Sequence, residues 1–394
     1  MIINGFTYSA VSAGIRKKDR LDLGLIFCER PAVAAGVFTS SLVKAAPVLL
    51  GMEKIITGQA QAILLNSGIA NACTGEAGMN AALKSAKLAA AALDINEGLV
   101  QVSSTGVIGE QLPVDTIAGA MDELLKGLSP LAYDRVAQAI MTTDTVPKTA
   151  DRICQIAGSE IKLFGIAKGA GMIMPDMATM LCFVMTDANI ASSVLQSHLA
   201  EAVQQSFNRI TVDGDTSTND TVLVLASCQA AHPEINTLET EESRVFAETL
   251  ADLLKDLALQ IVSDGEGATK LVTVRVTGAR SEDEAEQAAR TIANSDLVKT
   301  AFFGEDANWG RIIAALGRSG IDFDAERVAI SFDDVLMVQD GLGLGAEAEV
   351  KATEVLKQKM FSVTIDLKTG QAAGEIYTCD LSLDYVKINA DYRT

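Results

Sequence analysis

The spacing of apolar residues alternates between two periods along the chain, and this predicts a mixed α/β protein. Short apolar runs that end at polar turns predict buried strands at residues 61–66, 180–185 and 222–228. Apolar residues at helical spacing predict amphipathic helices at residues 79–93, 114–127 and 244–262. The pattern predicts fold class, but it does not reveal the order of the strands.

The C-terminal third continues this alternation. Residues 271–276 alternate with period two, as expected of a strand. Ser281 and Glu284 have the spacing of a capping box, which predicts a helix to about Ile292. The glycine run at 341–345 lacks the spacing of a dinucleotide-binding fingerprint and has no strong helix start after it, so we expect a loop or bulge. Three further strands are predicted at 361–367, 374–378 and 383–388.

Size and charge narrow the possible partners. The chain has 394 residues, of which 48% are hydrophobic, enough for two lobes or one large sandwich. The 32 Lys and Arg against 51 Asp and Glu give a net charge of −19, which argues against nucleic acid and anionic membranes as partners. No apolar run reaches the roughly 18 residues that a membrane helix needs, and the N-terminus lacks the features of a secretory signal. We therefore expect a cytoplasmic protein.

Histidine and cysteine are too sparse for many common sites. The six cysteines form no Cys-x-x-Cys pair, which favours reduced thiols and argues against a zinc site, so no metal cofactor is expected. His198 lies within a helical pattern beside apolar residues, and His232 precedes Pro233 in a loop-like segment. A catalytic base would therefore be a carboxylate, a lysine or a less usual group.

Residues 168–181, KGAGMIMPDMATML, are the most informative segment for chemistry. Glycines precede a predicted strand, and their backbone freedom would let the Thr179 hydroxyl attack the Ala178 carbonyl. Hydrolysis of the resulting ester would leave Thr179 as a new N-terminus. Its α-amine, which titrates at about 7.7, and its hydroxyl would form a nucleophile–base pair. A Gly-rich turn before a core strand, with no chemistry, is the alternative interpretation.

This segment resembles the self-cleaving site of the bifunctional ornithine acetyltransferase family, also called glutamate N-acetyltransferase, of arginine biosynthesis. Eight other segments resemble blocks of the same family, in the expected order and over nearly the whole chain. They are AAGVFTSSLVKAAPV (34–48), LNSGIANACTG (65–75), SSTGVIGE (103–110), MTTDTVPK (141–148), VDGDTSTNDT (212–221), SDGEGATK (263–270), GEDANWGRI (304–312) and KINADYRT (387–394).

The resemblance implies catalytic roles for three residues and the position of the cleaved bond. Thr179 would be the nucleophile and, through its α-amine, the base, and Ala178–Thr179 would be the cleaved bond. Thr105 and Gly106 would form the oxyanion hole, where a hydroxyl and a backbone N–H meet one developing charge. Without the resemblance, an ordinary strand-to-turn step would be the simpler account of this block.

The resemblance also implies substrate contacts. Lys168 would hold a carboxylate as a point-charge partner, and Glu266 would face an ammonium group. Thr143 is an alternative to Thr142. The implied contacts are Thr142, Lys168, Thr179, Glu266, Asn389 and Thr394.

The reaction implied is ping-pong transfer of an acetyl group from N2-acetyl-L-ornithine to L-glutamate through acetyl-Thr179, without a cofactor. Whether acetyl-CoA is a second donor stays open. The fold implied is an αββα-type sandwich resembling N-terminal-nucleophile enzymes, with family-specific connectivity. Chains 1–178 and 179–394 would fold as one body, commonly within an α2β2 heterotetramer. The alternatives are a self-cleaving aminopeptidase or amidase of similar architecture and a non-enzymatic α/β binding protein.

Overall fold

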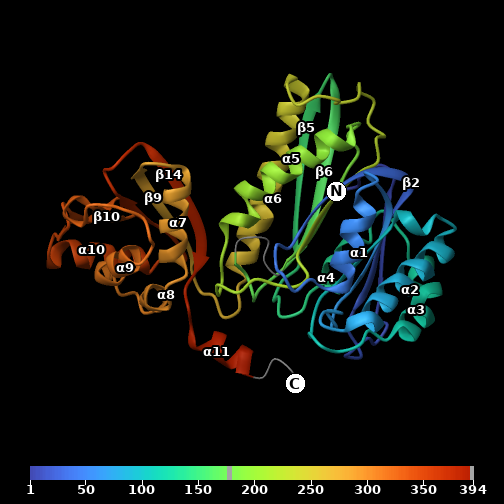
Figure 1. Cartoon of the computed structure of the whole chain (residues 1–394), viewed down its shortest axis with the longest axis horizontal. Helices are drawn as coiled ribbons and strands as arrows, with labels where there is room; N and C mark the ends of the chain where they lie inside the picture. Colours follow the sequence, from blue (N-terminus) through green and yellow to red (C-terminus); the bar gives the residue numbers. More distant parts are fainter. Residues whose placement is uncertain (175–179, 391–394) are drawn as a thin grey trace. The chain divides into compact units, whose positions relative to one another are not determined.

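The computed structural model describes residues 1–174 and 180–390, which form two compact units (Figure 1). Unit 1 contains residues 1–208 and 215–261. Unit 2 contains residues 209–214 and the chain from 262 onward. The predicted cleavage point at residue 179 therefore falls inside unit 1, away from the boundary between the units.

Unit 1 is built on an eight-stranded sheet with the order β4-β3-β2-β8-β7-β6-β5, in which β1 also pairs with β2. Its strands are β1 (Phe6–Val11), β2 (Leu23–Phe38), β3 (Gln59–Asn66), β4 (Val100–Ser104), β5 (Lys148–Ile156), β6 (Ser159–Lys168), β7 (Leu181–Thr186) and β8 (Thr221–Ala226). Its helices are α1 (Ala46–Ile55), α2 (Gly75–Leu93), α3 (Val114–Lys126), α4 (Tyr133–Ala139), α5 (Ser192–Gln205) and α6 (Glu241–Ser263), the last of which runs into unit 2.

A bend in β2 folds this sheet into two facing halves. Residues 23–33 pair with β3, residues 33–38 pair with β8, and the β2–β3 register shifts between Phe27 and Ala32. The exposed Pro31 lies in this shift, where a residue without an N–H donor is tolerated. Across the resulting core, Tyr8 of β1 packs edge-on against Phe164 of β6 with ring centroids 6.5 Å apart, although these strands are not neighbours in the sheet.

Helices cover the outer faces of both halves, as the alternation of side chains along the strands requires. Ile26 of β2 belongs to the inner core, whereas Leu25 points outward into a cluster with residues of α2 and α3. On the other half, Gly165 of β6 lies against Leu253 and Leu257 of α6, and α5 covers β2. Unit 1 is therefore a helix–sheet–sheet–helix sandwich, and the fold class predicted from the sequence is confirmed (Figure 1).

Unit 2 contains a six-stranded sheet with the order β12-β11-β10-β13-β9-β14. Its strands are β9 (Leu271–Ala279), β10 (Ala329–Phe332), β11 (Val335–Gln339), β12 (Leu342–Gly343), β13 (Met360–Asp366) and β14 (Ala372–Cys379). Helix α7 (Glu282–Ala293) packs on β9 and β14. Its other helices are α8 (Asp296–Phe303), α9 (Trp309–Gly317), α10 (Ala346–Leu356) and α11 (Leu383–Ala390).

Most predicted elements are confirmed within a few residues, including the capping box, in which the Glu284 N–H donates to Ser281 Oγ at 3.2 Å. The prediction of a strand at 383–388 is wrong, because these residues form α11. Ser382 Oγ accepts the Asp384 N–H at 3.2 Å, as a helix N-cap does, and this local hydrogen bond outweighs the apolar alternation. The glycine run, predicted as a loop or bulge, contains the short strand β12, which pairs with β11. A helix begins at Ala346, where no strong helix start was predicted. No helix in residues 1–174 or 180–390 is long and apolar enough to cross a membrane.

Candidate active site

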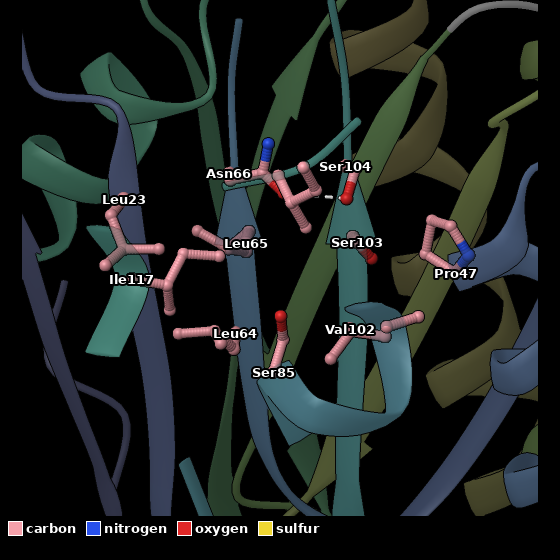
Figure 2. Close-up of a pocket in the computed structure, with 12 residues that line it drawn as sticks. Leu23, Pro47, Leu64, Leu65, Asn66, Ser85, Val102, Ser103, Ser104 and Ile117 are labelled. Atoms are coloured by element: carbon pink, nitrogen blue, oxygen red, sulfur yellow. Dashed lines mark hydrogen bonds between the residues drawn. The ribbon is translucent and has the colours of Figure 1, made fainter. Parts of the chain in front are cut away.

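The bend in β2 brings strand ends from both halves of the unit 1 sheet together. Ser104 Oγ, at the end of β4, donates to Asn66 Oδ1, at the end of β3, at 2.7 Å (Figure 2). Asn219, just before β8 in the other half, donates through Nδ2 to the carbonyl oxygens of Ser104 (2.8 Å) and Ala70 (2.7 Å). All three polar side chains are buried, so these bonds fix the two halves against each other at one edge.

Thr105 and Gly106 follow β4 at this edge. The Thr105 N–H donates to the Asn66 carbonyl oxygen at 3.0 Å, and the side chain is 4% exposed. Gly106 has a φ of +130°, and a Cβ there would lie 2.2 Å from the carbonyl carbon of Gly68. Only glycine fits this close approach between two backbones. The Gly106 N–H makes no hydrogen bond to another described residue, so it is available to an incoming group.

Lys168 lies in the other half of the sheet and contacts Thr105. It is the last residue of β6, and its side chain is 3% exposed. Its Nζ donates to Thr105 Oγ1 at 3.4 Å. Because this bond uses a lone pair of the hydroxyl oxygen, the Thr105 proton remains available to donate to a third group. The structure therefore gathers a cation, a hydroxyl donor and a backbone N–H at one edge.

Asp144 organises this cluster, although the sequence analysis did not single it out. Its Oδ1 accepts Lys148 Nζ and the Gly169 N–H, each at 2.7 Å, and its Oδ2 accepts the Thr142 N–H at 3.0 Å. Lys168 Nζ lies 4.0 Å from Oδ2. Burial alone would raise the pKa of this carboxyl, but Lys168 and Lys148 hold it below its ordinary value. Asp144 is therefore a buried carboxylate between two buried ammonium groups.

The sequence carried a signal for Asp144. An acid four residues before a lysine occurs within the MTTDTVPK block, which contains the predicted contact Thr142. The structure brings Thr142 into the cluster through its backbone N–H, and its side chain is half-buried, as is that of Thr143. The choice between the two threonines as substrate contact stays a prediction.

The predicted nucleophile lies outside the described residues, as do Ala178 and Thr394. The described chain resumes at Met180, which directly precedes β7. Leu181, the first residue of β7, is the antiparallel partner of Lys168 on β6. The start of β7 therefore pairs with the end of β6, which carries Lys168.

Glu266 and Asn389 form a second group, which lies in unit 2. Asn389 Nδ2 donates to Glu266 Oε2 at 2.7 Å, so α11 is held against the loop before β9. Glu266 is 7% exposed, and the Gly267 that follows it has a φ of +70°. The structure thus brings Thr105, Gly106, Thr142 and Lys168 together in unit 1, and Glu266 with Asn389 in unit 2.

Both histidines make hydrogen bonds within unit 1. His198 on α5 is buried and shares a 2.7 Å hydrogen bond with Ser243 Oγ on α6. His232 Nε2 accepts the Asn189 N–H at 2.9 Å. Within the described part of the chain, neither has a hydrogen bond or ion pair with the two groups above. Among residues 1–174 and 180–390, no three His, Cys, Asp or Glu side chains cluster as a metal site requires.

Comparison with known proteins gives extensive similarity. The model of the ArgJ family matches residues 7–394. The arginine biosynthesis bifunctional protein ArgJ of Desulfotalea psychrophila is 58% identical over 394 residues, covering 100% of both chains. The protein of the same name from Syntrophotalea carbinolica is 57% identical, covering 100% of this chain and 99% of its own. The crystal structure of arginine biosynthesis bifunctional protein ArgJ from Bacillus halodurans is 45% identical with a TM-score of 0.51, covering 53% of this chain and 97% of that chain.

Proposed function

The chain belongs to the ArgJ family, and from this premise we propose that it moves an acetyl group from N2-acetyl-L-ornithine to L-glutamate through an acetyl-Thr179 intermediate. This makes it a glutamate N-acetyltransferase of arginine biosynthesis. The observation that carries the assignment of the site is the 3.4 Å hydrogen bond from Lys168 Nζ to Thr105 Oγ1, beside the N–H of Gly106, which makes no hydrogen bond to another described residue. These groups lie at the edge of the sheet where β7 begins.

In the first half-reaction, the Thr179 α-amine takes the proton of its own hydroxyl as the oxygen attacks the acetyl carbonyl. The carbonyl oxygen becomes an oxyanion, which accepts the Thr105 O–H and the Gly106 N–H. Removing one such donor typically costs roughly 2.7–4 kcal/mol of barrier. The tetrahedral intermediate collapses, the C–N bond breaks, and the α-ammonium returns the proton to the departing ornithine amine.

In the second half-reaction, the amine of L-glutamate attacks the acetyl-Thr179 ester, and the same oxyanion hole serves again. The released Thr179 oxygen recovers its proton, and N-acetyl-L-glutamate leaves. The relatives are named bifunctional, which supports acetyl-CoA as a second donor of the acetyl group to the same threonine. No metal or redox cofactor has a role in either step, because both are simple acyl transfers.

Two opposite charges would recognise the substrate. Lys168, whose Nζ is held by Thr105 and lies near Asp144, would bind the carboxylate of acetylornithine. Glu266, oriented by Asn389, would bind its side-chain ammonium. We propose Thr142 and the C-terminal Thr394 as further substrate contacts. A C-terminal tag should then lower activity more than an N-terminal tag, and equal activities would remove Thr394 from the site.

Cleavage would divide the chain into residues 1–178 and 179–394. Strand β6 from the first product pairs with β7 from the second at six positions, from Leu163↔Thr186 to Lys168↔Leu181, which supports their remaining one body. The Bacillus halodurans chain is matched over 97% of its length by 53% of this chain, so it is about half as long, as a cleavage product would be. We further propose an α2β2 heterotetramer in the cytoplasm.

The experiment is intact mass measurement under denaturing conditions on the wild type, Thr179→Ala and the control Thr186→Ala, at the far end of β7. We expect fragments of 178 and 216 residues (394 − 178) in the wild type and in the control. Thr179→Ala should stay uncut. After incubation with N2-acetylornithine, the 216-residue fragment should carry one acetyl group.

An uncut wild-type chain would remove the proposed base and most of this mechanism. The alternative, a self-cleaving aminopeptidase or amidase, predicts that water takes the acetyl group at the same rate with and without glutamate. Family membership favours transfer, and ornithine release that depends on glutamate distinguishes the two.

A further inference from the structure

The loop between β1 and β2 is strongly basic, unlike the rest of the chain. Residues 16–20, RKKDR, contain four cations and one acid, a net charge of +3 (4 − 1), within a chain whose net charge is −19. No five-residue stretch outside these residues contains more than two Lys or Arg. Lys17 and Lys18 are exposed, and neither has a hydrogen bond or ion pair with another residue that the structure describes. Two adjacent ammonium groups repel each other, so this basic loop favours an anionic ligand.

The base of the basic loop is held in place by buried contacts. The Asp22 carboxylate is 2% exposed and accepts the Ile15 N–H at 2.6 Å. The Asp22 carbonyl oxygen accepts the Ser67 N–H at 3.0 Å, which joins the loop to the turn after β3. The Arg20 guanidinium donates to the carbonyl oxygen of Met141, which directly precedes a proposed substrate contact. The loop is therefore fixed against two segments of the candidate site, and a ligand would meet cations that are already in place.

The basic loop also borders the proposed oxyanion hole. A Cβ on Gly68 would lie 3.0 Å from the Cβ of Arg16, and a Cβ on Gly106 would lie 2.2 Å from the Gly68 carbonyl carbon. One Nη of Arg16 lies 3.7 Å from Glu110 Oε1, in the loop that follows Gly106. Lys18 is two residues beyond Arg16, which is at most about 7 Å of extended chain. The exposed lysines are therefore close to the groups that would polarise the acetyl carbonyl.

The charge and exposure of the basic loop fit phosphate groups better than a single carboxylate. Lys168, which is 3% exposed, is the single buried cation proposed for the carboxylate of acetylornithine. Several exposed cations instead suit a ligand with several charges that stay partly in water, and both Lys and Arg bind phosphates. Acetyl-CoA is such a ligand, because it carries a pyrophosphate and a 3′-phosphate at one end of a long flexible arm and its thioester at the other.

We propose that Lys17 and Lys18 bind the phosphates of acetyl-CoA when it serves as the acetyl donor. Its arm would then pass Gly68 and bring the thioester carbonyl to the Thr105 hydroxyl and the Gly106 N–H. The C–S bond breaks as the acetyl group passes to the nucleophilic hydroxyl of the proposed mechanism, and the CoA thiol leaves with the proton of that hydroxyl. The inference rests on the proposed function and adds to it a site for the second donor.

The test compares Lys17→Gln/Lys18→Gln with the control Lys84→Gln/Lys87→Gln. Lys84 and Lys87 are also exposed, on α2, so the two double variants change the net charge equally. The value of kcat/KM is measured for three acetyl donors with L-glutamate as the acceptor. The donors are acetyl-CoA, acetyl-pantetheine, which has the same thioester but no phosphates, and N2-acetylornithine. In a ping-pong reaction this value reports the donor half-reaction alone.

For acetyl-CoA, kcat/KM of Lys17→Gln/Lys18→Gln should fall about five- to thirtyfold, as expected for the loss of two exposed charge pairs. Its values for acetyl-pantetheine and N2-acetylornithine should equal those of the wild type, because neither donor carries a phosphate. Higher salt should narrow the difference with acetyl-CoA, because exposed charge pairs are screened. Lys17→Arg/Lys18→Arg, which keeps both charges, and the α2 control should match the wild type with all three donors.

An equal loss with acetyl-CoA and acetyl-pantetheine would overturn the proposal, because the lysines would then act without the phosphates. An unchanged kcat/KM for acetyl-CoA would overturn it as well. So would a higher KM for glutamate with N2-acetylornithine as donor, since the loop would then bind the acceptor carboxylates. A wild type that transfers acetyl from N2-acetylornithine but not from acetyl-CoA contradicts this inference alone. A wild type that uses neither donor contradicts the proposed function, and this inference with it.

Discussion

The Lys148 ammonium donates to Asp144 Oδ1 at 2.7 Å, and the two side chains are 1% and 0% exposed. Both charges have thus been removed from water, which is costly unless each is paired and hydrogen-bonded. Asp144 meets this condition through backbone donors on either side of the site, Thr142 and Gly169. The ion pair therefore joins the segment with a predicted substrate contact to the segment that leads into the predicted cleavage point.

Replacing Asp144 by Asn should destabilise unit 1 strongly. The change leaves Lys148 and Lys168 as buried cations without their shared carboxylate, and breaking a buried pair in this way costs roughly 3–5 kcal/mol. Thermal unfolding should show a lower Tm than the wild type. The double variant Asp144→Asn/Lys148→Met should recover part of the loss, because it removes one of the unpaired charges. A double variant less stable than the single one would contradict this account.

The same pair predicts a pH dependence of stability. The pKa of Asp144 is lower in the folded protein than its unfolded value of about 3.9. Its stabilising contribution is therefore complete above that pH and is lost as the pH falls below it. Tm measured between pH 6 and about pH 3 should fall less steeply in Asp144→Asn than in the wild type. Parallel curves would mean that the carboxylate is not linked to folding in this range.

Removing the Thr105 hydroxyl should slow catalysis with little effect on binding. Thr105→Val keeps the shape but loses a proposed oxyanion donor, and comparable losses lower kcat by about 10²–10³. Thr105→Ser retains the hydroxyl and is the matched control. Steady-state kinetics should give nearly unchanged KM values for both. Equal kcat values for the Ser and Val variants would exclude the hydroxyl from the oxyanion hole.

Gly106 and Gly109 lie in the same loop, but only Gly106 is crowded by neighbouring atoms. Both have positive φ values, +130° and +86°, but a Cβ meets the Gly68 backbone at 2.2 Å only in the first case and nothing within 4 Å in the second. Gly109→Ala should cost about 1 kcal/mol of stability and leave kcat intact. Gly106→Ala should move the strand end and abolish transfer. Thermal unfolding and kcat report the two effects, and similar behaviour of the variants would contradict the close-approach argument.

Glu266→Gln should weaken binding of N2-acetylornithine. A hydrogen bond to a charged group contributes about 1.5–3 kcal/mol, so KM should rise roughly tenfold to a hundredfold. Glu375→Gln is the control, because Glu375 is another acid of unit 2 and pairs with Arg275 at 2.7 Å. The control should keep its KM. A lower kcat at constant KM in Glu266→Gln would place Glu266 in the chemistry rather than in substrate recognition.

The sequence pattern predicted a helix or strand correctly where apolar residues recur at one regular spacing along the whole element. Apolar spacing in α6 and period two in β9 predicted both elements, because their periodicity is continuous. The pattern missed β2, whose 16 residues change partners at an exposed bend, so no single period describes the strand. It misassigned α11, an exposed helix with no buried residues and therefore no apolar face to detect.

The residues of the candidate site were likewise predicted only in part. Thr105, Gly106 and Lys168 were identified because their blocks resemble a known family. Asp144 was passed over because, apart from the lysine four residues later, nothing in its local sequence distinguishes it from the many exposed acids of the chain. Its role depends on partners distant in sequence, such as Gly169, which lies 25 residues away.

The sequence by itself determined the mixed α/β class, the family, the reaction that family performs and the residues predicted to carry it. The tertiary structure alone decided which polar groups are removed from water and which of them meet. The bend in β2 sets Ser104 beside Asn219, 115 residues apart, and burial makes each such contact obligatory. Solvation and long-range proximity are properties of the folded chain, so no local pattern of residues encodes them.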